Sequence, residues 1–180
     1  KTPWFGPAYD IATLSAPAIL GDAANFPTSL WDASVPVLLC SPRMRSDLVE
    51  QARFWERRFF ETPPDRSLAD RDWSWLLERL RKARVKTVLD VGFGRGHWSV
   101  ALARAGFQVT AVEISTVAVE HLRAWAEEEG LPIEAFVCPA QELPTDRVFD
   151  AVIANFVLDH MFKEEAEEAM RRIHAVLRPG

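Results

Sequence analysis

The stretch Val88–Gly96, which reads V-L-D-V-G-F-G-R-G, decides the fold of this chain. Its first four residues are apolar except for Asp90, and this composition predicts a short buried strand. Three glycines follow at alternate positions, where the missing Cβ atoms let the backbone turn sharply and approach a ligand closely. The helix predicted next covers His97–Ala105, and Gly106 ends it. A strand, a glycine turn and a helix in this order are typical of a nucleotide-binding site in α/β proteins.

The spacing of the glycines indicates which kind of nucleotide the turn holds. Dinucleotide-binding turns follow the pattern G-x-G-x-x-G, whereas here the third glycine comes one residue early and His97 takes its usual place. Asp90 lies two positions before the first glycine, where a carboxylate repels a pyrophosphate and attracts a cationic aminoacyl group. S-adenosylmethionine carries an ammonium and a sulfonium group and no phosphate. The pattern therefore favours this cofactor over a dinucleotide, with a purely structural turn as the alternative.

From about Trp55 to Gly180 the chain resembles the class I S-adenosylmethionine-dependent methyltransferases. The resemblance rests on the glycine motif Leu89–Gly96, the F-D-x-V form of Phe149–Val152, the corner Leu143-Pro144 and the L-x-P-G form of Leu177–Gly180. It implies an α/β fold with a doubly wound, mostly parallel Rossmann-like sheet and helices on both faces. It also implies methyl transfer from S-adenosylmethionine, and the aromatic, acidic composition favours a small-molecule acceptor.

The chain divides into three parts by composition. Residues 1–45 form an extension rich in proline and aromatic residues, and residues 46–84 carry two amphipathic patterns that predict helices over Ser46–Phe60 and Ser67–Lys82. Methyltransferases that resemble this chain have a helical cap over the cofactor at this point. Residues 85–180 form the predicted cofactor-binding core.

The ribose of the cofactor is assigned to Glu113. The predicted strand Phe107–Glu113 ends in this acid at the same sheet edge as the glycine turn, where a carboxylate can accept hydrogen bonds from both ribose hydroxyls. Pro139 stands where the family that the chain resembles often has the Asp that binds adenine, so adenine would depend on Ala140 or Gln141. The predicted cofactor-binding residues are Asp90, Gly92, Phe93, Gly94, Glu113, Ile114, Ala140, Gln141 and Asn155.

The predicted catalytic residue is His160, which follows the fourth predicted strand at the mouth of the sheet. Its imidazole can act as a base or orient an acceptor, with Asp159 beside it, whereas orientation alone suffices for an acceptor that need not lose a proton early. Aromatic and basic residues of the first cap helix either reach the methionine moiety or pack into the core. These residues are Phe54, Trp55, Arg57 and Phe59.

Bulk composition excludes several other classes of protein. The net charge of −5 argues against a nucleic-acid substrate. Cys40 and Cys138 match no metal spacing, so no metal site is predicted, and free buried thiols in a reducing compartment are expected. No apolar run is long enough to span a membrane, and no signal pattern opens the sequence, so a cytoplasmic location is predicted.

Two other functions stay open. A nicotinamide-dependent oxidoreductase shares the fold, although the glycine spacing and Asp90 count against it; a non-catalytic cofactor-binding or scaffold protein would keep every motif named above. The sheet of the resembled family has seven strands, and only four are predicted before Leu177–Gly180. We therefore expect the natural protein to continue past Gly180. The alternatives are that Val35–Cys40 and the aromatic N-terminal segment fold back onto the sheet, or that a partner chain covers it. The oligomeric state is left open.

Overall fold

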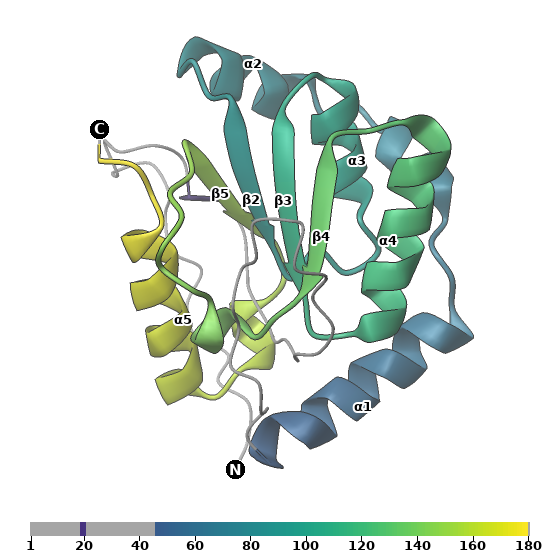
Figure 1. Ribbon diagram of the computed structural model, residues 1–180, viewed down its shortest axis with the longest axis vertical. Coiled ribbons are helices and arrows are strands. Elements are labelled where there is room, and N and C mark those ends of the chain that lie inside the picture. Colours follow the sequence, from purple (N-terminus) through teal and green to yellow (C-terminus); the bar gives the residue numbers. More distant parts are fainter. Residues whose placement is uncertain (1–18, 21–45, 180) are drawn as a thin grey trace.

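The computed structural model describes residues 19–20 and 46–179 (Figure 1). The strands are β1 (Ile19–Leu20), β2 (Thr87–Val91), β3 (Gln108–Glu113), β4 (Ile133–Val137) and β5 (Ala151–Ala154). The α-helices are α1 (Ser46–Glu61), α2 (Ser74–Lys82), α3 (His97–Arg104), α4 (Thr116–Glu129) and α5 (Lys163–Ala175). Three short 3-10 helices are η2 (Arg66–Asp70), η3 (Ala140–Glu142) and η4 (Leu158–His160).

The strands form one parallel sheet in the order β1-β5-β2-β3-β4, which confirms the predicted doubly wound α/β fold. From β2 the chain moves outward through β3 to β4, then crosses back to place β5 on the other side of β2. In such sheets, ligands bind at the carboxyl ends of the two neighbouring strands between which the direction of winding reverses. Here these two strands are β2 and β5. Beyond β5 lies Ile19–Leu20, whereas Val35–Cys40 falls outside the described residues.

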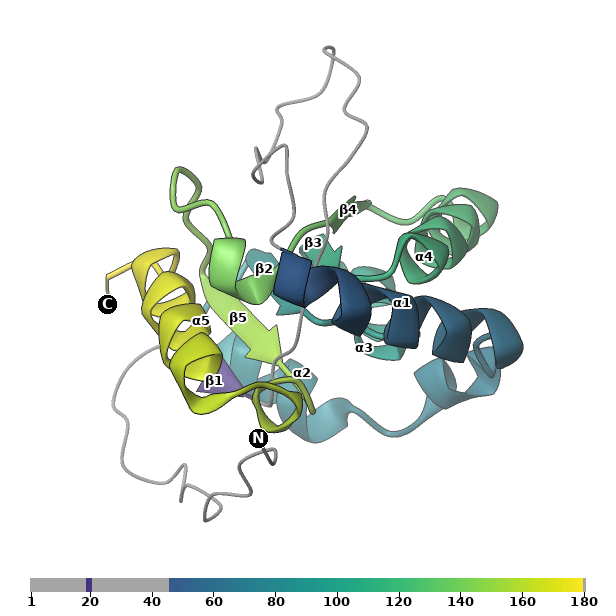
Figure 2. The ribbon, with the colours of Figure 1, turned by 90° about the horizontal axis from the view of Figure 1, so that it is seen from below.

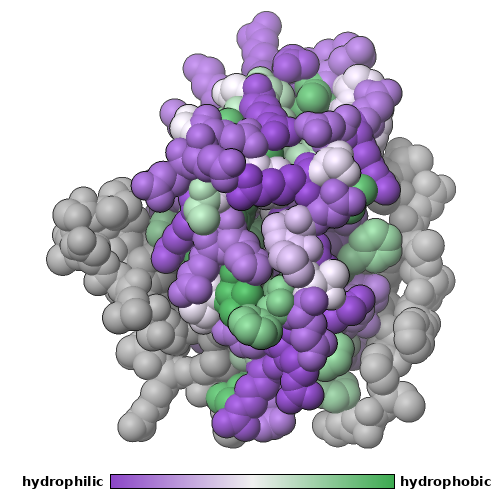
Figure 3. Space-filling view, turned by 90° about the vertical axis from the view of Figure 1, so that its right-hand side faces the viewer, coloured by the Kyte–Doolittle hydropathy of each residue, from purple (hydrophilic) through white to green (hydrophobic). Residues whose placement is uncertain are grey.

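Alternating side chains of the strands build two cores, one on each face of the sheet. Leu89, Val91 and Val112 pack with α5, whereas Val88 and Val109 pack with α2, α3 and α4. Figure 1 shows α5 on one side of the sheet and α3 and α4 on the other. The outer surface on the α3 and α4 side is largely hydrophilic, as Figure 3 shows, in keeping with amphipathic helices.

The two helices predicted within residues 46–84 are confirmed in part. Helix α1 matches the predicted range to within a residue, but the single helix predicted over Ser67–Lys82 is wrong, because η2 and α2 are separate elements. Arg71 between them is extended, with φ −60° and ψ 159°. Helix α2 then begins at Ser74 after the N-cap residue Trp73, and Oδ1 of the preceding Asp72 accepts a hydrogen bond of 2.9 Å from the backbone N–H of Ser74. Apolar periodicity continued across this break and concealed it.

The prediction of a free thiol is wrong at Cys138, whose side chain is buried and whose sulfur is in a disulfide. The only other cysteine of the chain, Cys40, lies outside the described residues. Because the prediction of a reducing compartment depended on free thiols, Cys138 does not support it. Within residues 19–20 and 46–179, no helix is long and apolar enough to cross a membrane.

Candidate active site

A cavity of about 590 Å³ opens at the carboxyl edge of the sheet, where β2, β3 and β5 end. Helix α1 lies across this edge in both ribbon views (Figures 1 and 2). The cavity brings together seven of the residues predicted from sequence, six for the cofactor and one for catalysis. These residues are Asp90, Gly92, Phe93, Gly94, Glu113, Asn155 and His160.

Three other predicted residues do not line the cavity. Ile114 and Ala140 are fully buried in the core beside α5, and Gln141 is buried within η3. Ile114 nevertheless acts on the site through its backbone, because its N–H donates a hydrogen bond of 2.6 Å to Oε1 of Glu113. The adenine corner around Ala140 and Gln141 therefore stays a prediction that the cavity lining does not support.

The three glycines of the loop after β2 differ in what surrounds the position of a Cβ atom. Gly92, Gly94 and Gly96 all have left-handed backbones, with φ of +65°, +58° and +79°. A Cβ at Gly92 would overlap the side chain of Val157, and one at Gly96 would lie 2.7 Å from Leu122 Cδ1, so these two glycines permit close packing. At Gly94 the nearest atom to a Cβ is 3.8 Å away, on the cavity side. Gly94 is thus the glycine that leaves room for a ligand.

Glu113 is buried at the end of β3 and is held by three backbone N–H groups. Its Oε2 accepts from Gly94 at 3.0 Å, and its Oε1 accepts from Ile114 at 2.6 Å and from Ser115 at 3.3 Å. Burial raises the pKa of Glu113 to about 8 and the nearby Asp90 adds to this rise, while the three hydrogen bonds oppose it. The carboxyl group is therefore fixed in direction, faces the cavity and titrates near neutral pH.

Asp90 is the second carboxyl group in the cavity wall. It is 1% exposed, and its Oδ2 accepts a hydrogen bond of 2.5 Å from the Ser99 hydroxyl in the first turn of α3. Burial raises the pKa of Asp90 to about 7, against the effect of the Ser99 hydrogen bonds. Asp90 thus joins β2 to α3 beneath the glycine loop and presents negative charge to the cavity when it ionises.

Arginine and histidine side chains line another part of the cavity wall. Arg95 donates two hydrogen bonds to the carbonyl oxygen of Thr62, at 3.1 and 2.9 Å, so its guanidinium is already engaged. The side chain of Arg71 has no hydrogen bond or ion pair with any residue in the described part of the chain. Burial lowers the pKa of His97, and its Nε2 is buried without a hydrogen-bond partner among the described residues. Arg71 and His97 are therefore available to a ligand carboxylate.

Helix α1 is anchored to the site through Glu56. Its Oε2 accepts from the Ser115 hydroxyl at 2.7 Å and from Val117 N–H at 3.1 Å, and its Oε1 accepts from Thr116 N–H at 3.0 Å. Glu56 thus caps the N-terminus of α4, where the positive end of the helix dipole favours a carboxylate. This contact brings the Trp55 ring to the cavity, where it packs edge-on against His160 at 5.1 Å.

Of the four cap residues proposed for the site, two line the cavity and two do not. Trp55 and Phe59 line it and stack on each other at 5.7 Å between ring centroids. Phe54 is 62% exposed and, like the exposed Arg57, does not line the cavity. The helical period explains this division, since residues four positions apart share a face of α1.

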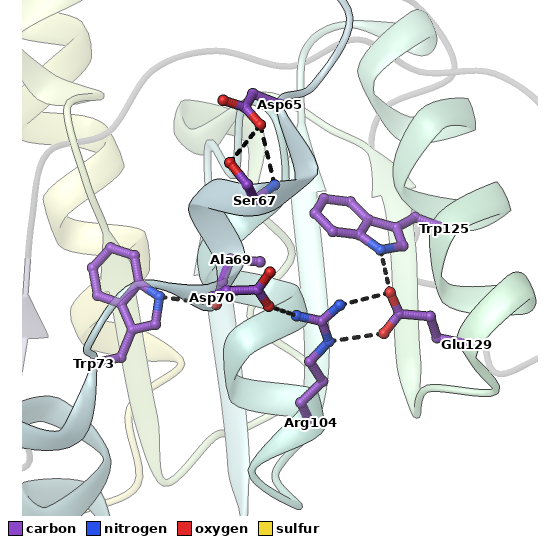
Figure 4. A network of polar contacts seen from close by, with 8 residues as sticks. All are labelled: Asp65, Ser67, Ala69, Asp70, Trp73, Arg104, Trp125 and Glu129. Carbon is purple, nitrogen blue, oxygen red and sulfur yellow. Dashed lines mark hydrogen bonds and ion pairs between the residues drawn. The ribbon is translucent and has the colours of Figure 1, made fainter.

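Arg104 holds the η2 wall of the cavity to the core (Figure 4). From the last turn of α3 its guanidinium donates to Asp70 Oδ1 at 2.6 Å and to both carboxylate oxygens of Glu129, at 2.8 and 2.7 Å. The indole N–H of Trp125 also donates to Glu129, at 2.6 Å. The ends of η2, α3 and α4 thus meet at one guanidinium, and the pKa of Arg104 is raised chiefly by its hydrogen bond to Glu129.

We expect Arg104→Ala to lower the free energy of unfolding by about 1–2 kcal/mol. The substitution removes the guanidinium that binds both carboxylate oxygens of Glu129 and connects Glu129 to Asp70. Arg53→Ala is the matched control, since its single ion pair with Glu50 joins side chains that are 70% and 78% exposed. That control is expected to cost less than about 0.5 kcal/mol. Urea denaturation measures the free energy of unfolding of both variants. An equal decrease in the two would show that the Arg104 network stabilises the fold no more than an exposed ion pair does.

Several cavity residues were not predicted. Arg71 and Trp73 belong to the cap, and their approach to the glycine loop depends on the break between η2 and α2. Trp98 follows His97 in α3 and packs against Trp73 with ring centroids 4.0 Å apart. In the sequence, Trp98 and Trp73 look like ordinary residues of amphipathic helices, and only their adjacency in space distinguishes them.

The chain is similar to a known domain family and to curated proteins. The methyltransferase domain family matches residues 88–180, which is just over half of the chain. A ubiquinone biosynthesis O-methyltransferase of Bordetella avium is 28% identical over 131 residues, 72% of this chain and 53% of the relative. One of Paramagnetospirillum magneticum is 34% identical over 94 residues, 52% of this chain and 37% of the relative. The chain thus spans about half or less of the length of these curated relatives.

Solved structures agree with the fold. The CcbJ methyltransferase from Streptomyces caelestis has a TM-score of 0.54 and 24% identity, covering 66% of this chain and 47% of its own. CalS10, an amino pentose methyltransferase from Micromonospora echinaspora with S-adenosylmethionine bound, has a TM-score of 0.53 and 22% identity, covering 73% of this chain and 52% of its own. With the family match over the glycine loop, the sheet and α5, the chain belongs to the class I S-adenosylmethionine-dependent methyltransferases.

Proposed function

We propose that this domain binds S-adenosylmethionine in the cavity and transfers its methyl group to a small-molecule acceptor. The observation that carries the proposal is the pairing of the open cavity side of Gly94 with the buried carboxyl group of Glu113, joined by a hydrogen bond of 3.0 Å. A flat surface without a Cβ beside a fixed carboxyl acceptor suits a ribose with two hydroxyl donors.

The remaining wall residues fit the other end of the cofactor. Arg71 and His97 lie where they can meet the methionine carboxylate, and Asp90 offers negative charge to the ammonium or sulfonium group. When bound, S-adenosylmethionine supplies an electrophilic methyl group on a good leaving group, so the protein does not need to activate the methyl group itself. The chain's own residues orient the acceptor and exclude water, and proximity of this kind accelerates a displacement strongly.

Oxygen is the proposed methylated atom, because relatives are named O-methyltransferases. His160 is proposed as the base that accepts the acceptor's hydroxyl proton. It lines the cavity at the end of η4, and its Nε2 lies 4.0 Å from Asp159 Oδ1. That oxygen is buried without a hydrogen-bond partner among the described residues, which leaves it free to orient a protonated imidazole.

We expect His160→Ala to lower kcat about 10²–10⁴-fold while the affinity for S-adenosylmethionine stays within twofold of wild type. The reason is that His160 lies in η4 after β5, whereas Glu113, which is proposed for the ribose, ends β3 on the other side of β2. His121→Ala on α4 is the control, because His121 does not line the cavity. Loss of only a few-fold in kcat would show that orientation alone suffices and that His160 is not the base.

Thermal-shift titration of the full-length protein tests cofactor binding directly. S-adenosylmethionine and S-adenosylhomocysteine are expected to stabilise the protein in a concentration-dependent way, and NAD is not. Stabilisation by NAD alone would favour the oxidoreductase alternative. Cofactor binding without any transfer of labelled methyl groups to small molecules would favour a non-catalytic role.

Three further points stay proposals. The division into an extension over 1–45, a cap over 46–84 and a core over 85–180 rests on composition and on the place of α1 over the cavity. A cytoplasmic location stays a prediction from the sequence, which the disulfide of Cys138 does not support. The acidic net charge of −5 supports a small-molecule partner over a nucleic acid.

A further inference from the structure

Phe156 has an unusual backbone for its residue type. Its φ is +54°, and within residues 19–20 and 46–179 only Arg84, at +57°, shares a left-handed backbone among non-glycine residues. This conformation brings Cβ close to the following carbonyl oxygen, and Gly, Asn and Asp adopt it far more readily than a bulky aromatic residue does. Phe156 is therefore strained where it stands.

The side chain of Phe156 contributes little buried apolar surface to offset this strain. Its relative exposure is 70%, so most of the ring contacts solvent. The neighbouring Val157 is buried, and its methyl groups fill the space over Gly92. The left-handed turn thus lets Val157 point into the core while the Phe156 ring lines the mouth of the cavity. Strain combined with an exposed apolar ring at a cavity points to a functional constraint.

Two other flat rings line the same cavity as Phe156. Trp55 and His160 line the same cavity, and their rings meet edge-on at 5.1 Å. Asn155, next to Phe156, adds a hydrogen-bonding amide to the wall. Aromatic side chains around an opening, with a few polar groups, suit a planar ring that can stack and present a hydroxyl group to His160.

We propose that Phe156 is a specificity-determining residue that stacks on a planar aromatic acceptor and selects it over saturated acceptors. This inference rests on the proposed methyl transfer and adds the class of acceptor to it. The strained turn places the ring at the mouth before the acceptor arrives, so stacking requires no reorganisation of the backbone.

The test compares Phe156→Asn and Phe156→Tyr in the full-length protein, with Arg84→Asn as the matched control. Asparagine relieves the backbone strain at either position, whereas tyrosine keeps both the ring and the strain. Arg84 does not line the cavity around Glu113, so its variant isolates the effect of strain relief. The probes are S-adenosylhomocysteine for cofactor affinity, catechol as the aromatic acceptor and cyclohexane-1,2-diol as its saturated counterpart.

Phe156→Asn is expected to raise the melting temperature by about 2–4 °C, since relief of strain stabilises the folded state. It is also expected to lower kcat/KM for catechol about 10-fold, mainly through KM, with S-adenosylhomocysteine affinity unchanged. Phe156→Tyr should keep the wild-type KM within about twofold, because it retains the ring. Arg84→Asn should raise the melting temperature similarly and leave KM unchanged.

Three results would overturn the inference. They are an unchanged KM in Phe156→Asn, equal turnover of cyclohexane-1,2-diol and catechol by the wild type, and no turnover of catechol by protein that binds S-adenosylhomocysteine. Failure of the protein to bind S-adenosylhomocysteine at all is a different outcome, because it overturns the proposed function itself. Calorimetry on the wild type separates the two cases before any variant is compared.

Discussion

Gly94→Val is expected to weaken S-adenosylmethionine binding by more than about 100-fold, which corresponds to about 2.7 kcal/mol. The backbone of Gly94 is left-handed at φ +58°, and a Cβ there projects into the cavity with Phe59 Cζ as its nearest atom, at 3.8 Å. A branched side chain would fill the space assigned to the ligand. It would also disturb the N–H group that Gly94 donates to Glu113. Isothermal titration calorimetry measures the loss.

Gly130→Val provides the matched control for this substitution. Gly130 has φ +62° at the end of α4, and nothing lies within 4 Å of a Cβ placed there. Both valines therefore meet a similar backbone strain of about 1–2 kcal/mol, but only one enters the cavity. Gly130→Val should lose stability and keep its affinity. Binding by Gly94→Val within threefold of wild type would contradict the assignment of Gly94 to the ligand.

Glu113→Gln is expected to lower the affinity for S-adenosylmethionine by about 1.5–3 kcal/mol, the range for hydrogen bonds to charged groups. It should also remove the part of the pH dependence of binding that Glu113 causes, while the part due to Asp90, whose pKa is about 7, should stay. Ribose hydroxyls donate to the carboxylate, so binding favours the ionised form of a group whose pKa is about 8 without ligand. Wild-type affinity should therefore rise with pH and level off above about pH 8, with release of a proton on binding below that pH. Titrations in buffers of different ionisation enthalpy detect the proton.

The same pKa gives an opposite pH trend in the stability of the ligand-free protein. Burial raises the pKa of Glu113 in the folded state from its ordinary value of 4.5 to about 8, so the folded state binds more protons than the unfolded state between these limits. The free energy of unfolding should therefore fall as pH rises through this window. Glu113→Gln should reduce that slope to the part that the raised pKa of Asp90 causes, and Glu50→Gln on the exposed side of α1 should leave the slope unchanged. A pH-independent affinity of the wild type would contradict the role of Glu113.

The core of the site could be predicted because its residues are close in sequence to strong local signals. The apolar run before Gly92 predicts β2, and Glu113 ends the next apolar strand, so parallel pairing places both at one edge. His160 and Asn155 follow β5 by the same reasoning. These assignments need only hydrophobic periodicity and the rule that parallel strands share a carboxyl edge.

The cap could not be predicted in the same way, because its contacts join residues far apart in sequence. Glu56 meets the start of α4 about sixty positions later, and no local pattern marks it as more than an exposed helical glutamate. The break at Arg71 escaped periodicity because apolar residues continue on both sides of it. The strain at Phe156 was also hidden, since backbone dihedral angles of a non-glycine residue leave no trace in composition.

The carboxylate of Glu56 also helps to determine which cofactors this domain excludes. Together with Glu113 it occupies the hydroxyl of Ser115 and the N–H groups of residues 114–117, the donors at the start of α4. A phosphorylated ribose would need those donors for its phosphate and would instead meet two acidic side chains. Redesign toward a phosphate-bearing nucleotide would therefore have to remove a residue of the cap as well as one of the sheet.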